Sequence, residues 1–195
     1  VWCINLYNFM DGIDGLAAGE ALMVGGFAGA FAFIKGPLPL AVVCWLLAAA
    51  VGGFLIWNWP PAKIFMGDVG SGFLGFIIST LALSFERKGV LPALLWFIFL
   101  AVFIIDATAT LCLRIIQKKR WYEPHHEHAY QIAVQTGYSH GQVTTMVMII
   151  DALLGLVGFA AVFLGLPLLL ALAIVILPLL LLWGYFVFFR KLRFS

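Results

Sequence analysis

Charged side chains are scarce in this sequence. Only 10% of its 195 residues are Asp, Glu, Lys or Arg, whereas 64% are hydrophobic and the mean hydropathy is +1.09. So few charges cannot form a water-facing surface, and a disordered chain has the opposite bias, so both of these classes are excluded. The chain is therefore predicted to lie in a lipid bilayer.

The small excess of basic residues and the dispersed cysteines exclude further functions. The 11 Lys and Arg residues exceed the 9 Asp and Glu residues by only two, so no basic face is available to neutralise many phosphates. This argues against a nucleic-acid partner. The three cysteines, Cys3, Cys44 and Cys112, lie far apart in apolar runs, which gives no metal-binding or redox pattern.

Long uncharged runs predict the transmembrane helices. Residues 36–62 form a run of 27, and 69–85 and 89–105 form runs of 17, each near the roughly 20 residues that cross a bilayer. The 38 uncharged residues of 152–189 are too many for one crossing, so Gly165–Pro167 is predicted to divide them. The predicted fold is an all-α polytopic membrane bundle of about six helices, at 16–34, 38–57, 69–85, 91–113, 141–164 and 168–189.

The basic residues orient this bundle. On one side lie 8 of the 11, namely Lys63, Arg114, Lys118, Lys119, Arg120, Arg190, Lys191 and Arg193. The positive-inside rule places that side in the cytoplasm. The chain begins at Val1 within an apolar stretch, which suggests the C-terminal part of a longer protein. We therefore expect 1–195 to be a single transmembrane domain that is truncated at its N-terminus.

The first polar segment, 5–17, contains Asn8, Asp11 and Asp14 at intervals of three residues. On a helical turn, neighbouring members of this set share a face. Carboxylate and amide oxygens there suit Mg²⁺, or ribose hydroxyls and a base edge. The alternative is a helix end with Asx capping and two glycine turns, and the spacing alone does not decide between them.

The second polar segment, 58–73, places Asp68 between Gly67 and Gly70 just before a predicted helix. Free N–H groups at a helix N-terminus favour anions, so a Mg²⁺ ion on Asp68 would bring a diphosphate against them. Lys63 is placed to neutralise another oxygen. Alternatively, Asp68 or Ser71 simply caps the helix.

The third polar segment, 114–141, carries His125, His126 and His128. Three histidines in four residues suit phosphate donors beside a metal. A zinc site is the alternative, although no cysteine or second histidine cluster accompanies them. Ser139 and Gln142 fit a capping box for the following helix. Among the acids within membrane helices, Asp106 is the one expected to face this site.

Together, Asn8–Ala17, Pro61–Ser71 and His126–Gln131 resemble the polyprenyl-phosphate N-acetylhexosamine-1-phosphate transferases (glycosyltransferase family 4), a family that includes phospho-MurNAc-pentapeptide transferase and the UDP-GlcNAc:undecaprenyl-phosphate enzymes. The three motifs occur in the family's order and on one membrane face. The His-x-His-x-Tyr-Gln form is closer to the branch that starts O-antigen and other lipopolysaccharide or surface glycans.

The resemblance implies an enzyme of about ten helices in the bacterial inner membrane, with its active site facing the cytoplasm. It would transfer a sugar 1-phosphate from a UDP-N-acetylhexosamine to polyprenyl (undecaprenyl) phosphate, release UMP, and use Mg²⁺ or, as a substitute, Mn²⁺. A homodimer is compatible with it. The implied metal ligands are Asp68 and Asn8, the catalytic residues Asp11, Asp14, Asp68, His126 and His128, and the substrate-binding residues Asn5, Asn8, Asn58, Lys63, Gly70, Ser71 and His125.

One departure affects the expected activity. The family carries an adjacent pair of aspartates on an early cytoplasmic loop, and no such pair occurs in these 195 residues. We therefore expect this stretch alone to be inactive, although the complete protein is an enzyme. Two other classes stay open: a non-catalytic protein that binds polyprenyl phosphate, and a transporter, for which polar groups near the midplane would be needed instead of polar groups at one face.

Overall fold

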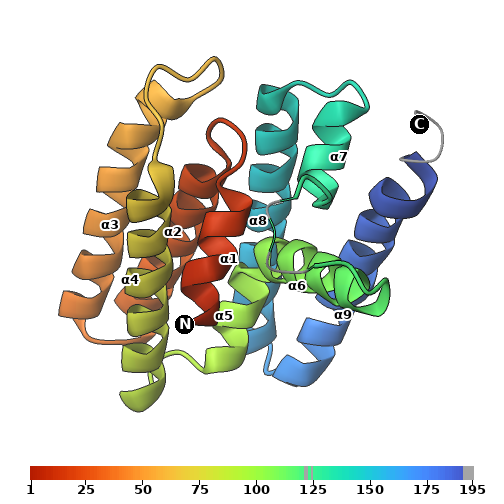
Figure 1. The fold of residues 1–195 in the computed structure, drawn as a ribbon. Helices are drawn as coiled ribbons and strands as arrows, with labels where there is room; N and C mark the ends of the chain where they lie inside the picture. Colours follow the sequence, from red (N-terminus) through yellow and green to blue (C-terminus); the bar gives the residue numbers. More distant parts are fainter. Residues whose placement is uncertain (121–122, 124, 191–195) are drawn as a thin grey trace.

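The chain folds almost entirely into helices. Figure 1 shows the computed structural model, which describes residues 1–120, 123 and 125–190. These residues form α1 (Trp2–Met10), α2 (Leu16–Lys35), α3 (Leu38–Asn58), α4 (Gly67–Arg87), α5 (Ala93–Phe99), α6 (Ala101–Ile116), α7 (Ala129–Gln135), α8 (His140–Phe163), α9 (Leu168–Gly184) and a π-helical turn (Tyr185–Arg190). None of the described residues lies in a strand.

The predicted all-α membrane bundle is confirmed. Within the described ranges, five helices are long and apolar enough to cross a bilayer. They are α2, α3, α4, α8, and α9 with the π turn that extends it. Counting α5 and α6 as one broken span gives six. Pro178 lies inside α9.

The prediction of one continuous helix over 91–113 is wrong. Leu100 ends α5 and begins α6, and the two axes are bent by 81°. The polar residues of α6 explain what this bend achieves: Asp106, Thr110 and Arg114 are four residues apart and share one face. The bend turns this face toward α7 and the segment before it, where buried polar side chains find partners.

A second correction concerns the first polar segment. Asn8 lies on α1, but α1 ends at Met10 and residues 11–15 form a loop, so Asn8, Asp11 and Asp14 do not share a helical face. Gly15 stands in this loop at a φ of 78°, in the left-handed region where glycine is favoured. The loop carries Asp11 and Asp14 in separate directions, as the site geometry shows.

Close packing surrounds α2, the most buried of the spanning helices. It packs mainly against α3 and α8, and α1 packs against α4. At the α1–α4 contact a Cβ on Gly75 would collide with the backbone of Cys3, so this small residue permits the approach. Glu20 and Asp151 neighbour each other in the interior, and Glu20 is fully buried, at 0% exposure.

The polar loops gather at one end of the bundle. In Figure 1 the α1–α2, α3–α4 and α7–α8 connections lie together at the top, away from the α2–α3 and α8–α9 turns. The predicted capping box starts α8 here: Gln142 N–H donates to Ser139 Oγ (3.2 Å) and Ser139 N–H to Gln142 Oε1 (2.9 Å). Lys191 and Arg193, used for the orientation, lie outside the described residues.

Candidate active site

Asn58 and Asp14 join the first two polar loops. Gly15 N–H donates to Asn58 Oδ1 (2.9 Å), and Asn58 Nδ2 donates to the Ile64 carbonyl (2.9 Å). A second link runs from the α3–α4 loop to the first loop, where Ala62 N–H donates to Asp14 Oδ2 (3.1 Å). Both ends of the buried Asn58 amide are therefore engaged within the protein, and this side chain fixes the relative position of the loops.

The start of α8 is attached to the same place. His140 Nδ1 lies 3.4 Å from Asp14 Oδ2, and Thr144 Oγ1 donates to the Asp14 carbonyl (2.8 Å). Asp14 thus holds three segments together through its carboxylate and backbone. Neither His140 nor Thr144 was predicted as part of this site, because nothing in the sequence shows that α8 returns to the first loop.

Asp11 and Asp68 form the acidic pair of this site. Asp11 follows α1 and is half-buried, whereas Asp68 lies in the exposed first turn of α4. Burial, together with the nearby negative charge of Asp68, raises the pKa of Asp11 to about 7. Among the described residues, neither carboxylate has a hydrogen bond or ion pair with a cationic side chain. The pair therefore places two acidic groups without described cationic partners at this end of the bundle.

Asn8 on α1 and Ser71 on α4 face each other where these two helices pack together. Asn8 Nδ2 donates to Ser71 Oγ (3.4 Å), and Ser71, which is buried, donates in turn to backbone carbonyls of its own first turn. Gly70 is half-buried beside it, and Asn5 is exposed on α1, one turn before Asn8. The structure therefore brings Asn8, the acidic pair and Ser71 to one corner, as the motifs predicted.

The acidic pair fits a magnesium ion. Mg²⁺ is usually held by one or two carboxylates, and water and substrate phosphates complete its octahedral shell. Two carboxylates with no donor, beside the Asn8 amide, match this donor set. The described part of the chain holds no group of three or more His, Cys, Asp or Glu side chains that could enclose a metal, which a zinc site would need.

Lys63 stands apart from this corner. It is exposed on the α3–α4 loop, and its Nζ lies over the Trp57 ring at 5.1 Å from the centroid. Its charge is available to a ligand at the loop surface.

The histidine cluster, His125, His126 and His128, lies on the segment before α7. His125 stacks on His128 with ring centroids 4.8 Å apart. His128 is buried, at 3% exposure, and its Nδ1 lies 3.4 Å from Asp106 Oδ1, whereas His126 is exposed. The three histidines therefore differ in exposure: His126 is accessible to a ligand, whereas His128 is buried beside Asp106.

His125 is uncharged at neutral pH. Burial, with smaller contributions from the nearby His128 and Arg114, lowers its pKa to about 4. His126 contacts Gln131 through its Nδ1 (3.3 Å). The base of this segment is fixed by Arg114, which binds Glu127 (2.6 Å) and the Arg120 carbonyl (2.7 Å).

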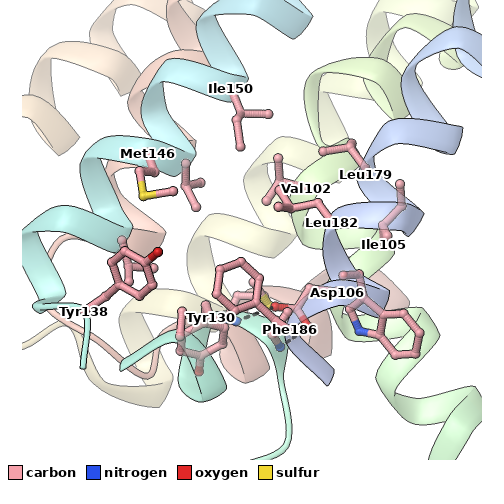
Figure 2. Close-up of a pocket in the computed structure, with 16 residues that line it drawn as sticks. Val102, Ile105, Asp106, Tyr130, Tyr138, Met146, Ile150, Leu179, Leu182 and Phe186 are labelled. Atoms are coloured by element: carbon pink, nitrogen blue, oxygen red, sulfur yellow. Dashed lines mark hydrogen bonds between the residues drawn. The ribbon is translucent and has the colours of Figure 1, made fainter. Parts of the chain in front are cut away.

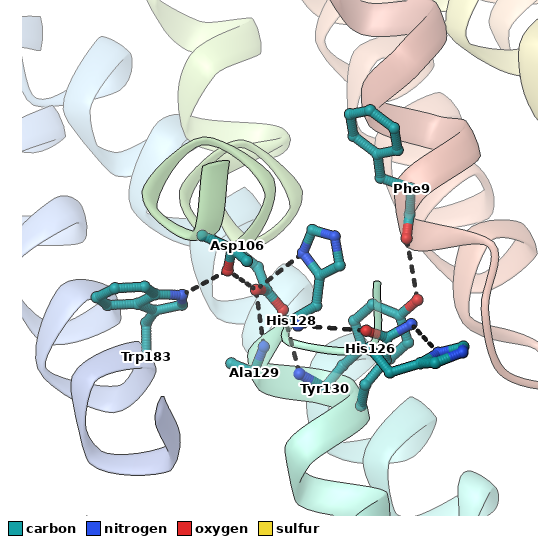
Figure 3. A network of polar contacts seen from close by, with 9 residues as sticks. Phe9, Asp106, His126, His128, Ala129, Tyr130 and Trp183 are labelled. Carbon is teal, nitrogen blue, oxygen red and sulfur yellow. Dashed lines mark hydrogen bonds and ion pairs between the residues drawn. The ribbon is translucent and has the colours of Figure 1, made fainter. Parts of the chain in front are cut away.

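Tyr130 joins the histidine cluster to the acidic corner. Its hydroxyl donates to the Phe9 carbonyl at the end of α1 (2.9 Å), and the Phe9 ring stacks on His128 at 6.2 Å. The first loop approaches this ring so closely that a Cβ on Gly12 would collide with the phenol. Segments more than 100 residues apart in the sequence thus form one site (Figure 3).

An apolar cavity adjoins the site on the side of α9. Figure 2 shows that α6, α7, α8 and α9 all contribute to its lining, which includes Val102, Ile105, Tyr130, Met146, Ile150 and Leu182. Asp106 and Tyr130 lie where this cavity meets the polar groups. A ligand with a charged head and a hydrocarbon tail matches such a boundary.

The fold and the site define a polytopic membrane protein with an acidic corner and a histidine cluster at one end. Residues 1–86 match the model of glycosyl transferase family 4. The chain belongs to this family.

Three relatives illustrate the similarity. A probable undecaprenyl-phosphate N-acetylglucosaminyl 1-phosphate transferase of Bacillus subtilis is 34% identical over 75% of this chain and 41% of its own length. A phospho-N-acetylmuramoyl-pentapeptide-transferase of Clostridium kluyveri is 34% identical over 80% and 48%, and an undecaprenyl-phosphate alpha-N-acetylglucosaminyl 1-phosphate transferase of Yersinia pestis 28% identical over 81% and 45%. The chain thus spans about half the length of the curated relatives it matches.

Proposed function

We propose that the complete protein transfers an N-acetylhexosamine 1-phosphate from a UDP-sugar to polyprenyl phosphate at the cytoplasmic face of a bacterial inner membrane. An acceptor phosphate oxygen forms a bond to the β-phosphorus, the bond from that phosphorus to the bridging oxygen breaks, and UMP leaves. The product is a lipid diphosphate sugar, which starts a cell-envelope glycan; the His-x-His-x-Tyr-Gln pattern favours a surface glycan such as O-antigen. The relatives' names support this chemistry.

The observation that carries the proposal is the acidic pair, placed beside Asn8 and within one site with the histidines. Asp68, Asp11 and Asn8 would hold Mg²⁺, with Mn²⁺ as a substitute. When bound, the ion withdraws charge from the diphosphate. Asp14 and Asn58 keep the two loops in register, so that the carboxylates stay together.

The remaining polar residues bind and orient the substrates. Lys63 and the exposed His126 offer N–H donors to phosphate oxygens, and fixed donors of this kind stabilise charge that develops during transfer. Gly70 and Ser71, with backbone N–H groups in the first turns of α4, lie where an anion is favoured. Asn5, exposed on α1, is available to the nucleotide.

Polyprenyl phosphate has an apolar tail and a charged head, and the structure offers an apolar cavity beside polar groups. The apolar cavity offers a place for isoprenoid units, and Tyr130 at its boundary reaches the end of α1 near the acidic corner. A soluble UDP-sugar can approach only from the aqueous side. The proposed reaction therefore belongs at the end of the bundle where these environments meet.

The test is transfer of radiolabelled sugar into undecaprenyl phosphate by membranes that contain the full-length protein, with and without Mg²⁺. UDP-GlcNAc and a panel of other UDP-sugars serve as donors. Lipid-linked product that requires Mg²⁺ and disappears in Asp68→Asn supports the proposal. Binding of polyprenyl phosphate without product or UMP release from any donor would contradict it and favour the non-catalytic alternative.

A further inference from the structure

The carboxylate of Asp106 is the most fully engaged in this site, although the site motifs do not include it. Asp106 is 6% exposed, and Figure 3 shows the groups that converge on it. Its Oδ1 accepts hydrogen bonds from Ala129 N–H (2.8 Å) and Thr110 Oγ1 (3.2 Å), and its Oδ2 accepts one from Tyr130 N–H (3.1 Å). Thr110 is held in turn by Trp183 Nε1 (3.0 Å). The carboxylate is therefore rigidly placed from three helices.

This fixed carboxylate faces one nitrogen of His128. His128 Nδ1 lies 3.4 Å from Asp106 Oδ1, so the two nitrogens of the ring are not equivalent. An imidazole beside a carboxylate keeps its hydrogen on the facing nitrogen. The ring is also held by stacking on His125 (4.8 Å), Tyr130 (5.8 Å) and Phe9 (6.2 Å). Nε2 therefore points away from Asp106 in a defined direction.

We infer that Asp106 is a positioning residue that fixes the tautomer and orientation of His128 for the proposed transfer. With its hydrogen on Nδ1, His128 presents Nε2 to a phosphate, as an acceptor when neutral and as a second donor when protonated. The inference rests on the proposed function for the role of His128. The observation behind the pairing is the 3.4 Å distance between His128 Nδ1 and Asp106 Oδ1.

The competing explanation is that Asp106 only caps α7 through the Ala129 and Tyr130 amides. Two measurements separate these roles. Nitrogen NMR of the full-length protein labelled with ¹⁵N-histidine, assigned with His128→Asn, reports which nitrogen of His128 carries hydrogen. Amide hydrogen exchange at residues 129 and 130 reports the cap itself.

We expect wild-type His128 to show hydrogen on Nδ1 and Asp106→Asn to lose this preference. Asp151→Asn is the matched control, because Asp151 is a buried membrane aspartate that has no described contact with His128. It should leave the His128 signals unchanged. If Asp106→Asn also leaves them unchanged and alters only amide exchange, the pairing is wrong and Asp106 is a helix cap.

Kinetics supply the second test. Asp106→Asn should lower kcat roughly 10- to 100-fold with little change in KM for the UDP-sugar, as loss of an orienting partner does. In a His128→Asn background, where Asn can still begin a helix, the same change should cost nothing further. An equal loss in both backgrounds would overturn the inference. If no UDP-sugar is turned over, the proposed function fails, but the NMR result still decides the pairing.

Discussion

Two groups of aspartates in this site differ in how their charge is compensated. Asp106 accepts three hydrogen bonds and faces a histidine, so its charge is stabilised entirely by the protein. Asp11 and Asp68 have no such donors among the described residues, and burial together with the nearby charge of Asp68 raises the pKa of Asp11. An ionised carboxylate without a partner costs free energy. Such groups therefore occur mainly at sites where a ligand supplies the partner. The comparison supports the proposed cation binding at the acidic pair and the proposed positioning role of Asp106.

The largest effect is expected from removing one charge of the acidic pair. Asp68→Asn or Asp11→Asn should lower Mg²⁺-dependent transfer by about 100-fold or more, because an amide replaces a carboxylate ligand. Transfer in membranes with the full-length protein measures this. Glu123→Gln is the control, since Glu123 is an exposed acid that pairs only with Arg120 in the described structure and should leave activity unchanged. Equal losses in both variants would contradict a specific site.

The frame that holds the pair in place is tested through stability. Asn58→Ala leaves Gly15 N–H and the Ile64 carbonyl without their partner, which should lower the free energy of unfolding by about 1–3 kcal/mol. Thermal denaturation in detergent measures the change. Asn5→Ala should leave the denaturation temperature unchanged because Asn5 is exposed. A stable Asn58→Ala variant would show that the loops are held by other contacts.

Acidity should weaken cation binding at the acidic pair. Because the pKa of Asp11 is raised to about 7, protons occupy it increasingly as the pH falls below that value. Each unit below should weaken apparent Mg²⁺ affinity by up to about tenfold, since the ligand must be ionised to bind. Without the ion, folding stability contributed by Asp11 should fall as the pH rises from about 4 to 7, because the folded state binds more protons there. A Mg²⁺ requirement that does not change between pH 8 and 6 would contradict this assignment.

The smallest effect is expected from a surface ion pair of the same region. Arg120 and Glu123 are paired at 2.7 Å, but both side chains are largely exposed. Arg120→Ala should therefore change the free energy of unfolding by less than about 1 kcal/mol, as measured by thermal denaturation. A larger loss would show that ion pairs in this segment matter as much as the buried Asp106 contacts.

Much of the fold could be predicted from the sequence, since hydrophobic runs and breaks locate the long helices directly. The bend at Leu100 could not, because neither proline nor glycine occurs there. A signal did exist: Asp106, Thr110 and Arg114 repeat every four residues within an apolar helix, and such a polar stripe needs buried partners.

The site was predictable only in part. Asn8, Asp11, Asp68 and Ser71, which the motifs contain, lie at one corner, but the helical face predicted for Asn8, Asp11 and Asp14 does not exist. His140 and the close approach of Gly12 to Tyr130 depend on contacts between segments more than 100 residues apart. Sequence spacing carries no information about such contacts.

Direct binding of Mn²⁺, observed by electron paramagnetic resonance on the full-length protein, tests the central claim without any substrate. Wild type, Asp68→Asn, Asp11→Asn and Asp106→Asn are compared at pH 8 over a range of Mn²⁺ concentrations. The account predicts one site that both acidic-pair variants lose and that Asp106→Asn retains. Retention in Asp68→Asn, or loss in Asp106→Asn with the fold intact, would contradict it.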